Sequence, residues 1–168
     1  MEIGRRCPWL IAVAVWAALA AAPARATGPA AAIVEAFPRA WCGQYRWRGD
    51  PLIQRFALVF STLSVRHKDG RVIAGGRATI VVPGRRYTLL VTATIDPVTR
   101  TIELREHRPE PDTPDFTTDG THRGSVGPRW RSIRAVWTQN GTGEQGDLSL
   151  HAVAGSGVLP PVCGGPSV

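Results

Sequence analysis

The sequence has 168 residues, of which 20 are Lys or Arg and 13 are Asp or Glu, so the formal net charge is +7. This length suits one domain with its own core and is too short for two comfortable ones. The basic residues are nearly all arginines scattered along the chain, whereas nucleic-acid-binding proteins gather them in a patch with exposed aromatic side chains. We therefore expect no nucleic-acid partner.

The first 26 residues have the pattern of an export signal. Arg5 and Arg6 precede an uncharged apolar run over residues 9–22, and Ala24-Arg25-Ala26 has the small-x-small pattern of a cleavage site. The run of 14 residues is short of the roughly 20 that a membrane-spanning helix needs. We predict cleavage after Ala26, a periplasmic or secreted location, and no integral membrane span after cleavage. An uncleaved anchor is the alternative, and the export route stays open.

Cleavage would change both the charge and the cysteine count. It leaves 142 of the 168 residues and a net charge of +5, because three arginines and one glutamate are lost. It also removes Cys7, so that Cys42 and Cys163 remain. Two cysteines in an exported protein predict a disulfide, which in the chain-entropy model stabilises the fold by roughly 4 to 5 kcal/mol. Two free thiols are the alternative.

Residues 27–40 are predicted to form a flexible N-terminal segment, in which residues 30–37 could make one short helical turn that Pro38 ends. From Trp41 onward, β-prone runs alternate with turn residues, as in an antiparallel meander. Asp69-Gly70 is the strongest hairpin signal. After the run at Trp41, the expected strands cover residues 54–67, 71–82, 86–95, 101–107, 115–118, 121–126, 130–139 and 146–153.

Apolar residues alternate within these runs, as Phe56, Leu58 and Phe60 illustrate, and one apolar face per strand suits a sandwich or a closed barrel. A bond between Cys42 and Cys163 would bring the two ends of the β-region together, which favours closure. We therefore predict a single all-β domain over residues 41–168. It is an antiparallel up-and-down meander of about eight strands that closes into a barrel, with a β-sandwich as the alternative.

Over residues 41–153 the pattern resembles the small eight-stranded barrels of the calycin group, which includes lipocalins and avidins. The resemblance lies in the first strand, WCGQY at residues 41–45, in the successive hairpins, and in the closing stretches VWT at 136–138 and GDLSL at 146–150. It implies a barrel with an internal cavity for a small molecule. Lipocalins place a Gly two residues before the first-strand Trp, whereas here Trp41 precedes Gly43, so no family ligand residues carry over.

No motif for catalysis or for metal binding stands out. The serines at 125 and 156 lie in Gly-rich stretches without the spacing of a nucleophile elbow, and no phosphate-binding loop is present. The histidines lack the spacing of zinc ligands, so each is expected at the surface or at a strand end. They are His67, His107, His122 and His151. We predict no catalytic residue, no metal site and no cofactor.

Two features point to a ligand site. Glu106 shares strand parity with Ile102 and Leu104, so its carboxylate could mark a cavity mouth, pair with an arginine such as Arg134, or simply reach solvent. Aromatic side chains on the first run and on the run at 130–139 could line a pocket or fill the core. The predicted ligand-binding residues are Trp41, Tyr45, Trp47, Glu106 and Trp137.

The sequence thus favours an exported, non-catalytic binding domain that holds a small apolar ligand in a barrel cavity. A second hypothesis is a periplasmic interaction or inhibitor protein that docks an envelope partner through the connectors at 109–114 and 140–145. A small hydrolase with residues brought together only by the fold is the third.

Overall fold

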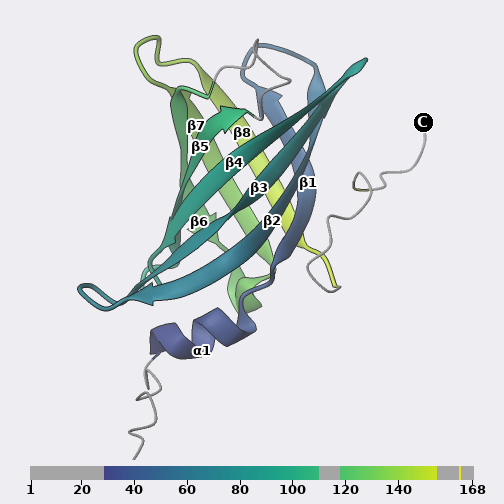
Figure 1. The fold of residues 1–168 in the computed structure, drawn as a ribbon. Coiled ribbons are helices and arrows are strands. Elements are labelled where there is room, and N and C mark those ends of the chain that lie inside the picture. Colours follow the sequence, from purple (N-terminus) through teal and green to yellow (C-terminus); the bar gives the residue numbers. More distant parts are fainter. Residues whose placement is uncertain (1–28, 110–117, 155–162, 164–168) are drawn as a thin grey trace, which may run out of the picture.

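The computed structural model describes residues 29–109, 118–154 and 163. The described strands form one closed antiparallel barrel in which each strand pairs with the next and β8 pairs back with β1 (Figure 1). The all-β meander and its closure are therefore confirmed, and the sandwich alternative is wrong. The elements are α1 (Pro29–Ala36), β1 (Ala40–Trp47), β2 (Ile53–Arg66), β3 (Arg71–Val82), β4 (Arg85–Ile95), β5 (Thr101–Pro109), β6 (Gly120–Val126), the 3₁₀ helix η1 (Pro128–Trp130), β7 (Ser132–Gln139) and β8 (Gln145–Ala152).

Most boundaries agree with the predictions to within one or two residues. The predicted helical turn is α1, which lies in the segment expected to be flexible and ends before Pro38. β7 begins two residues later than predicted, because Arg129 and Trp130 adopt φ angles of 54° and 56°, which a strand does not allow. Of the predicted short strand at 115–118, only Thr118 is described, and it is not in a strand. The predicted signal peptide lies outside the described residues.

The hairpin between β2 and β3 follows from its turn residues. Gly70 has a φ of 68°, a value that costs glycine little. The Asp69 carboxylate accepts a hydrogen bond from Nε of Arg66 at 2.9 Å and one from the backbone N–H of Arg71 at 3.3 Å. These bonds hold the turn in place, so the register of the two longest strands is set locally.

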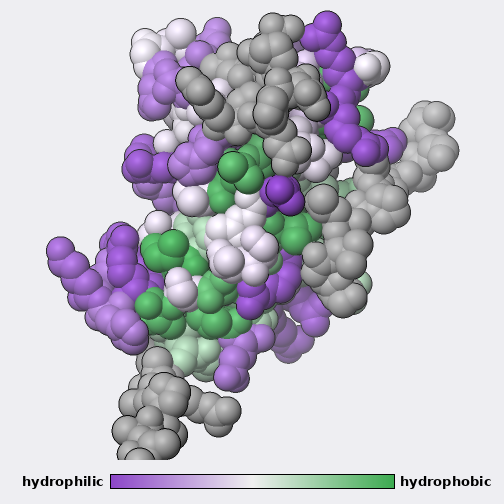
Figure 2. Space-filling model, in the orientation of Figure 1, coloured by the Kyte–Doolittle hydropathy of each residue, from purple (hydrophilic) through white to green (hydrophobic). Residues whose placement is uncertain are grey.

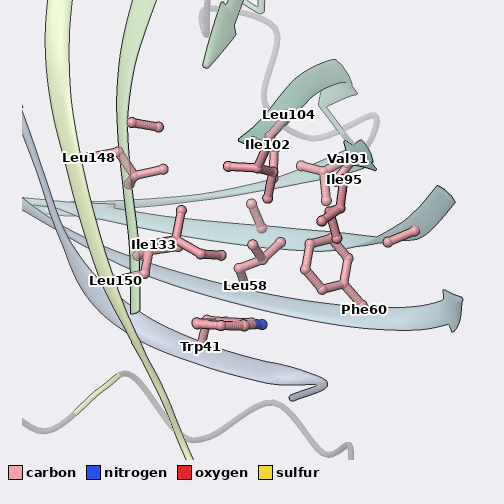
Figure 3. Packing of buried hydrophobic residues seen from close by; sticks show 14 of the residues in the cluster. Trp41, Leu58, Phe60, Val91, Ile95, Ile102, Leu104, Ile133, Leu148 and Leu150 are labelled. Carbon is pink, nitrogen blue, oxygen red and sulfur yellow. The ribbon is translucent and has the colours of Figure 1, made fainter. Parts of the chain in front are cut away.

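The interior of the barrel is filled mainly by alternate residues of the strands. Figure 3 shows side chains from several strands, among them Leu58, Ile102 and Leu150, pointing toward one another in the interior. These three are at most 3% exposed. A bulge in β2 between Phe60 and Thr62 shifts the register of this long strand, which helps it bend around the barrel.

One end of the barrel, here called the α1 end, is covered by the helix (Figure 1). Ala30, Ile33 and Phe37 are buried, and the Phe37 ring lies 5.3 Å from the Trp41 ring and 5.9 Å from the Trp130 ring. Burial of aromatic rings contributes strongly to stability. The helix therefore acts as an apolar plug that extends the core beyond the strands.

Cys42 and Cys163 form a disulfide with Cα atoms 5.5 Å apart, across a sequence separation of 121 residues. The predicted pairing is confirmed. Cys42 follows the interior residue Trp41 in β1, so its side chain points to the outside of the barrel. The bond thus ties a distant part of the chain to the outer face of the first strand.

The outer surface is largely polar. Figure 2 shows hydrophilic residues gathered toward both ends of the visible face, with apolar residues between them. Several arginines pair with carboxylates there, as Arg48 does with Asp147 at 2.8 Å and Arg123 with Glu103 at 3.1 Å. Among the described helices, none has the length and hydropathy to cross a bilayer.

Candidate ligand-binding site

Four of the five predicted ligand-binding residues lie together at the end of the barrel opposite α1, here called the polar end. Tyr45 and Trp47 come from the end of β1, and Trp137 comes from β7. The Trp47 ring lies 4.8 Å from the Trp137 ring and 5.5 Å from the Tyr45 ring, both nearly perpendicular. Glu106 of β5 lines the same small cavity. Strands far apart in the sequence thus bring these side chains to one place.

Trp41, the fifth predicted residue, lies elsewhere. Its side chain is fully buried at the α1 end, where its indole Nε1 donates a hydrogen bond to the carbonyl of Pro38 at 2.9 Å. Residues 41 and 45 share a face of β1 but are four residues apart, which corresponds to about 13 Å along a strand. Trp41 therefore packs in the core beside Phe37 and does not line the cavity of the polar end.

Glu106 pairs with a histidine and not with Arg134. Its Oε1 lies 2.8 Å from Nε2 of His122, and the two side chains are 4% and 1% exposed. Arg134 is exposed, because it is out of phase on β7 with the interior residues Ile133 and Ala135. The arginine alternative is therefore wrong.

The expectation for the histidines holds for three of them, since His67, His107 and His151 are exposed. It is wrong for His122, which β6 directs into the interior at the same level as Trp137 of β7. In the predicted strand at 121–126, His122 has the parity of Val126, so the pattern contained a signal for its burial. In a strand this short, shared parity with one apolar residue does not by itself predict burial.

Two glycines make room for the aromatic rings. A Cβ at Gly146 would lie 2.1 Å from the Tyr45 hydroxyl oxygen, and one at Gly120 would lie 2.3 Å from the Trp137 ring. Neither distance is compatible with a side chain at these positions. Glycine inside a strand often marks such a close approach. These two residues are therefore part of the site, although the sequence analysis did not single them out.

Several buried polar atoms of the polar end have no hydrogen-bond partner among the described residues. They are the Tyr45 hydroxyl, Nδ1 of His122 and Nε1 of Trp137. Burial, and secondarily the carboxylates of Glu106 and Asp147, raise the pKa of the Tyr45 phenol. The hydroxyl is thus protonated across the physiological range and can both donate and accept a hydrogen bond. An unpaired buried polar group costs about 1 to 3 kcal/mol, so such a cluster is unusual in a core.

A partly enclosed cavity of about 20 Å³ lies among these groups. This is room for about one water-sized group. Its lining is aromatic and apolar apart from Gln54, Glu106 and the polar atoms of Tyr45 and Trp137, and it contains no Lys or Arg among the described residues. Gln54 is buried and was not predicted, because a glutamine next to exposed Ile53 gives no sequence signal for an interior position.

The described residues do not assemble a known catalytic or metal centre. Nε2 of His122 is engaged by Glu106 and Nδ1 has no partner, so within the described ranges no hydroxyl or thiol is hydrogen-bonded to this imidazole. A histidine base without a nearby nucleophile lacks the arrangement used in covalent hydrolysis. Likewise, no three His, Cys, Asp or Glu side chains of the described residues are grouped to hold a metal ion.

Comparisons of the chain with protein-family models, with curated proteins and with solved structures found no match. The fold and the contacts of the polar end are therefore the observations on which its function is argued.

Proposed function

We propose that this protein is an exported, non-catalytic binding barrel of calycin-like design, whose ligand enters at the polar end. The observation that carries the proposal is the set of buried polar atoms without partners beside a cavity. A barrel interior filled by apolar side chains would be more stable, so polar groups there need another reason to be present. A ligand that hydrogen-bonds to part of this set, such as the Tyr45 hydroxyl, supplies that reason.

The size of the cavity limits what can enter. Because about 20 Å³ holds one small group, the ligand inserts only its end, and the remainder lies at the barrel mouth beside half-buried Trp47. This restricts the small apolar ligand expected from the sequence to one whose inserted end is slender. The packed side chains shown in Figure 3 fill the interior of the barrel.

Export is supported by two independent features. The basic and apolar pattern of residues 1–26 suits a signal peptide, and the paired Cys42 and Cys163 suit an oxidising compartment. The non-catalytic role rests on His122, whose imidazole has a carboxylate partner but no nucleophile among the described residues.

Native mass spectrometry of protein purified from its export compartment tests the proposal. We expect a small ligand to be retained, with a mass that disappears on denaturation. Removal of the ligand should change the tryptophan fluorescence of the wild type, and this change should be lost in Trp47→Phe. Trp130→Phe is the matched control, because Trp130 packs against Phe37 at the α1 end, and it should keep the change. A ligand-free protein whose fluorescence responds to no small molecule would reject the proposal.

A protein partner is the second candidate. The backbone N–H of Arg48 donates to the carbonyl of Gln145 at 2.9 Å, which ties the β1–β2 loop to the start of β8. Beside them, Leu52 and Ile53 are 38% and 54% exposed, and exposed apolar side chains suit a docking surface. In the same mass spectrum, this function would appear as a co-purified protein that is lost in Ile53→Asp.

A further inference from the structure

We infer that the cavity of the polar end receives a primary ammonium group, carried on an unbranched alkyl chain that leaves past Trp47. The inference rests on the proposed function and specifies the chemistry of its ligand. It depends on the size of the cavity, on the sign of the charge that lines it, on the hydrogen-bond acceptors available, and on the aromatic rings around it.

The size favours a primary ammonium. A cavity of about 20 Å³ accepts one group of the size of a water molecule, and an NH₃⁺ group has that size. A trimethylammonium group carries three methyl groups in place of the three hydrogens and would require the rings of Trp47 and Trp137 to move apart. These rings lie 4.8 Å from each other and are held by close packing.

The charge of the lining favours a cation. Glu106 is the acidic residue of the lining, and the cavity wall has no Lys or Arg among the described residues. Because Nδ1 of His122 has no partner, protonation there would leave a second N–H donor buried and unpaired. A neutral imidazole that donates from Nε2 to Glu106 fits the contacts, and the pair then carries one negative charge.

The acceptors match the three N–H donors of an ammonium group. The His122 contact uses Oε1 of Glu106, and a carboxylate has further lone pairs to offer. Tyr45 lines the cavity and is 5% exposed, and its buried hydroxyl has no partner among the described residues. Gln54 also belongs to the lining, and the carbonyl of its side-chain amide is able to accept a third hydrogen bond. One carboxylate, one phenol and one amide oxygen together form a suitable cradle.

The aromatic rings add a cation–π contribution. Tyr45, Trp47 and Trp137 stand nearly at right angles to their neighbours, at 85° and 81°, so they wall the cavity from different directions. The face of an aromatic ring attracts a cation, and this attraction is stronger where the cation is desolvated. A neutral group of the same size would gain the hydrogen bonds but not this attraction.

The test titrates protein purified under non-reducing conditions with three six-carbon probes at constant pH and salt. The probes are hexylamine, hexyltrimethylammonium and 1-hexanol, and binding is read by calorimetry and by tryptophan fluorescence. We expect hexylamine to bind at least about tenfold more tightly than either of the others. Nα-acetyl-lysine methylamide, measured alongside, distinguishes the lysine side chain of a protein partner from a free alkylamine. The inference is supported if either hexylamine or this lysine derivative binds more tightly than 1-hexanol and hexyltrimethylammonium.

Three variants test which residues are responsible for the binding of hexylamine. Glu106→Gln keeps the size and one acceptor but removes the charge, so hexylamine binding should fall at least about tenfold while hexanol binding changes little. Tyr45→Phe should weaken hexylamine binding to a smaller extent. Trp130→Phe, at the α1 end, should bind as the wild type does. Thermal unfolding of each variant shows that it is folded before its affinity is compared.

Two kinds of result would overturn the inference. Hexanol or hexyltrimethylammonium binding as tightly as hexylamine would show that charge or size does not select the ligand, while the proposed binding function would stand. No binding of any amine, together with a different ligand retained in the native mass spectrum, would reject the ammonium and keep the barrel as a binding protein. No amine binding and no retained ligand would reject both.

Discussion

The two ends of this barrel are built from the same strands but differ in whether their buried polar atoms have hydrogen-bond partners. At the α1 end, Nε1 of Trp41 donates to the carbonyl of Pro38, and the surrounding rings of Phe37 and Phe60 are apolar. At the polar end, the indole of Trp137 and the hydroxyl of Tyr45 are buried without partners in the described part of the chain. The first arrangement is that of a core, whereas the second leaves buried polar groups without hydrogen-bond partners in the described part of the chain.

The difference has an energetic consequence. Apolar packing at the α1 end contributes directly to folding, whereas the buried hydrogen bond between the Glu106 carboxylate and His122 must offset the loss of hydration of both groups. Changes at the α1 end should therefore lower stability and leave binding intact. Changes at the polar end should be able to remove binding with little loss of stability, or even with a gain.

Trp41→Ala should give the largest loss of stability, about 4 kcal/mol, because it leaves a cavity among fully buried rings and removes the bond to Pro38. Urea unfolding monitored by far-UV circular dichroism measures it. Where the variant is folded, its affinity for hexylamine should equal that of the wild type. A lost affinity at retained fold would show that the two ends are not independent.

Replacing His122 alone should cost about 3 kcal/mol, since His122→Leu leaves the carboxylate of Glu106 buried without its partner. The double variant Glu106→Leu with His122→Leu should recover this loss, and it should be as stable as the wild type or more stable. It should also fail to bind hexylamine. A double variant less stable than either single variant would indicate that the pair serves the fold and not a ligand.

Gly146→Ala should lower the free energy of unfolding by about 1 to 2 kcal/mol, because the added methyl group would displace the Tyr45 hydroxyl from its position. Ligand affinity should fall together with the stability. Ser149→Ala, on the outer face of the same strand, is the control and should change neither. Chemical unfolding measures the stability of the two variants, and calorimetric titration measures their ligand affinity. A Gly146→Ala variant with the stability and affinity of the wild type would contradict the prediction.

Asp69→Asn should have the smallest effect, because this carboxylate is on the surface at the β2–β3 turn. The hydrogen bond from Arg66 lowers the pKa of Asp69 from 3.8 to about 2. A depressed pKa stabilises the folded state above pH 3.8, and this contribution is lost as the pH falls toward 2. As the pH falls from 3.8 to about 2, the urea midpoint of the variant should therefore fall less than that of the wild type. At pH 7 the variant and the wild type should have equal affinity for the ligand.

The local parts of the fold could be predicted because they depend on neighbouring residues. The turn at Asp69-Gly70, the end of α1 before Pro38, and the alternation of Phe56 and Leu58 all follow from backbone geometry and strand periodicity. The start of β7 could not be predicted in this way. The positive φ of Trp130 accompanies its packing on Phe37, a contact across 93 positions of the chain.

Part of the site was predictable for the same reason. Parity in a strand identifies Tyr45, Trp47 and Trp137 as inward-facing, but parity does not say how far along the barrel each residue lies. That is why Trp41 was grouped with them although it packs at the other end. Parity also gives no means of choosing between Arg134 and His122 as a partner of Glu106, because His122 is 16 residues away and enters from the adjacent strand.

The sequence by itself determined the class of fold, the order of the strands and the pair of cysteines, because periodicity, turn residues and the cysteine count are properties of short segments or of composition. Only the tertiary structure decided that the barrel closes through β1 and β8, that α1 plugs one end, and that Glu106 and His122 meet beside Tyr45 at the other. The reason is that strand stagger and barrel curvature set the level of each side chain, and these depend on all eight strands together.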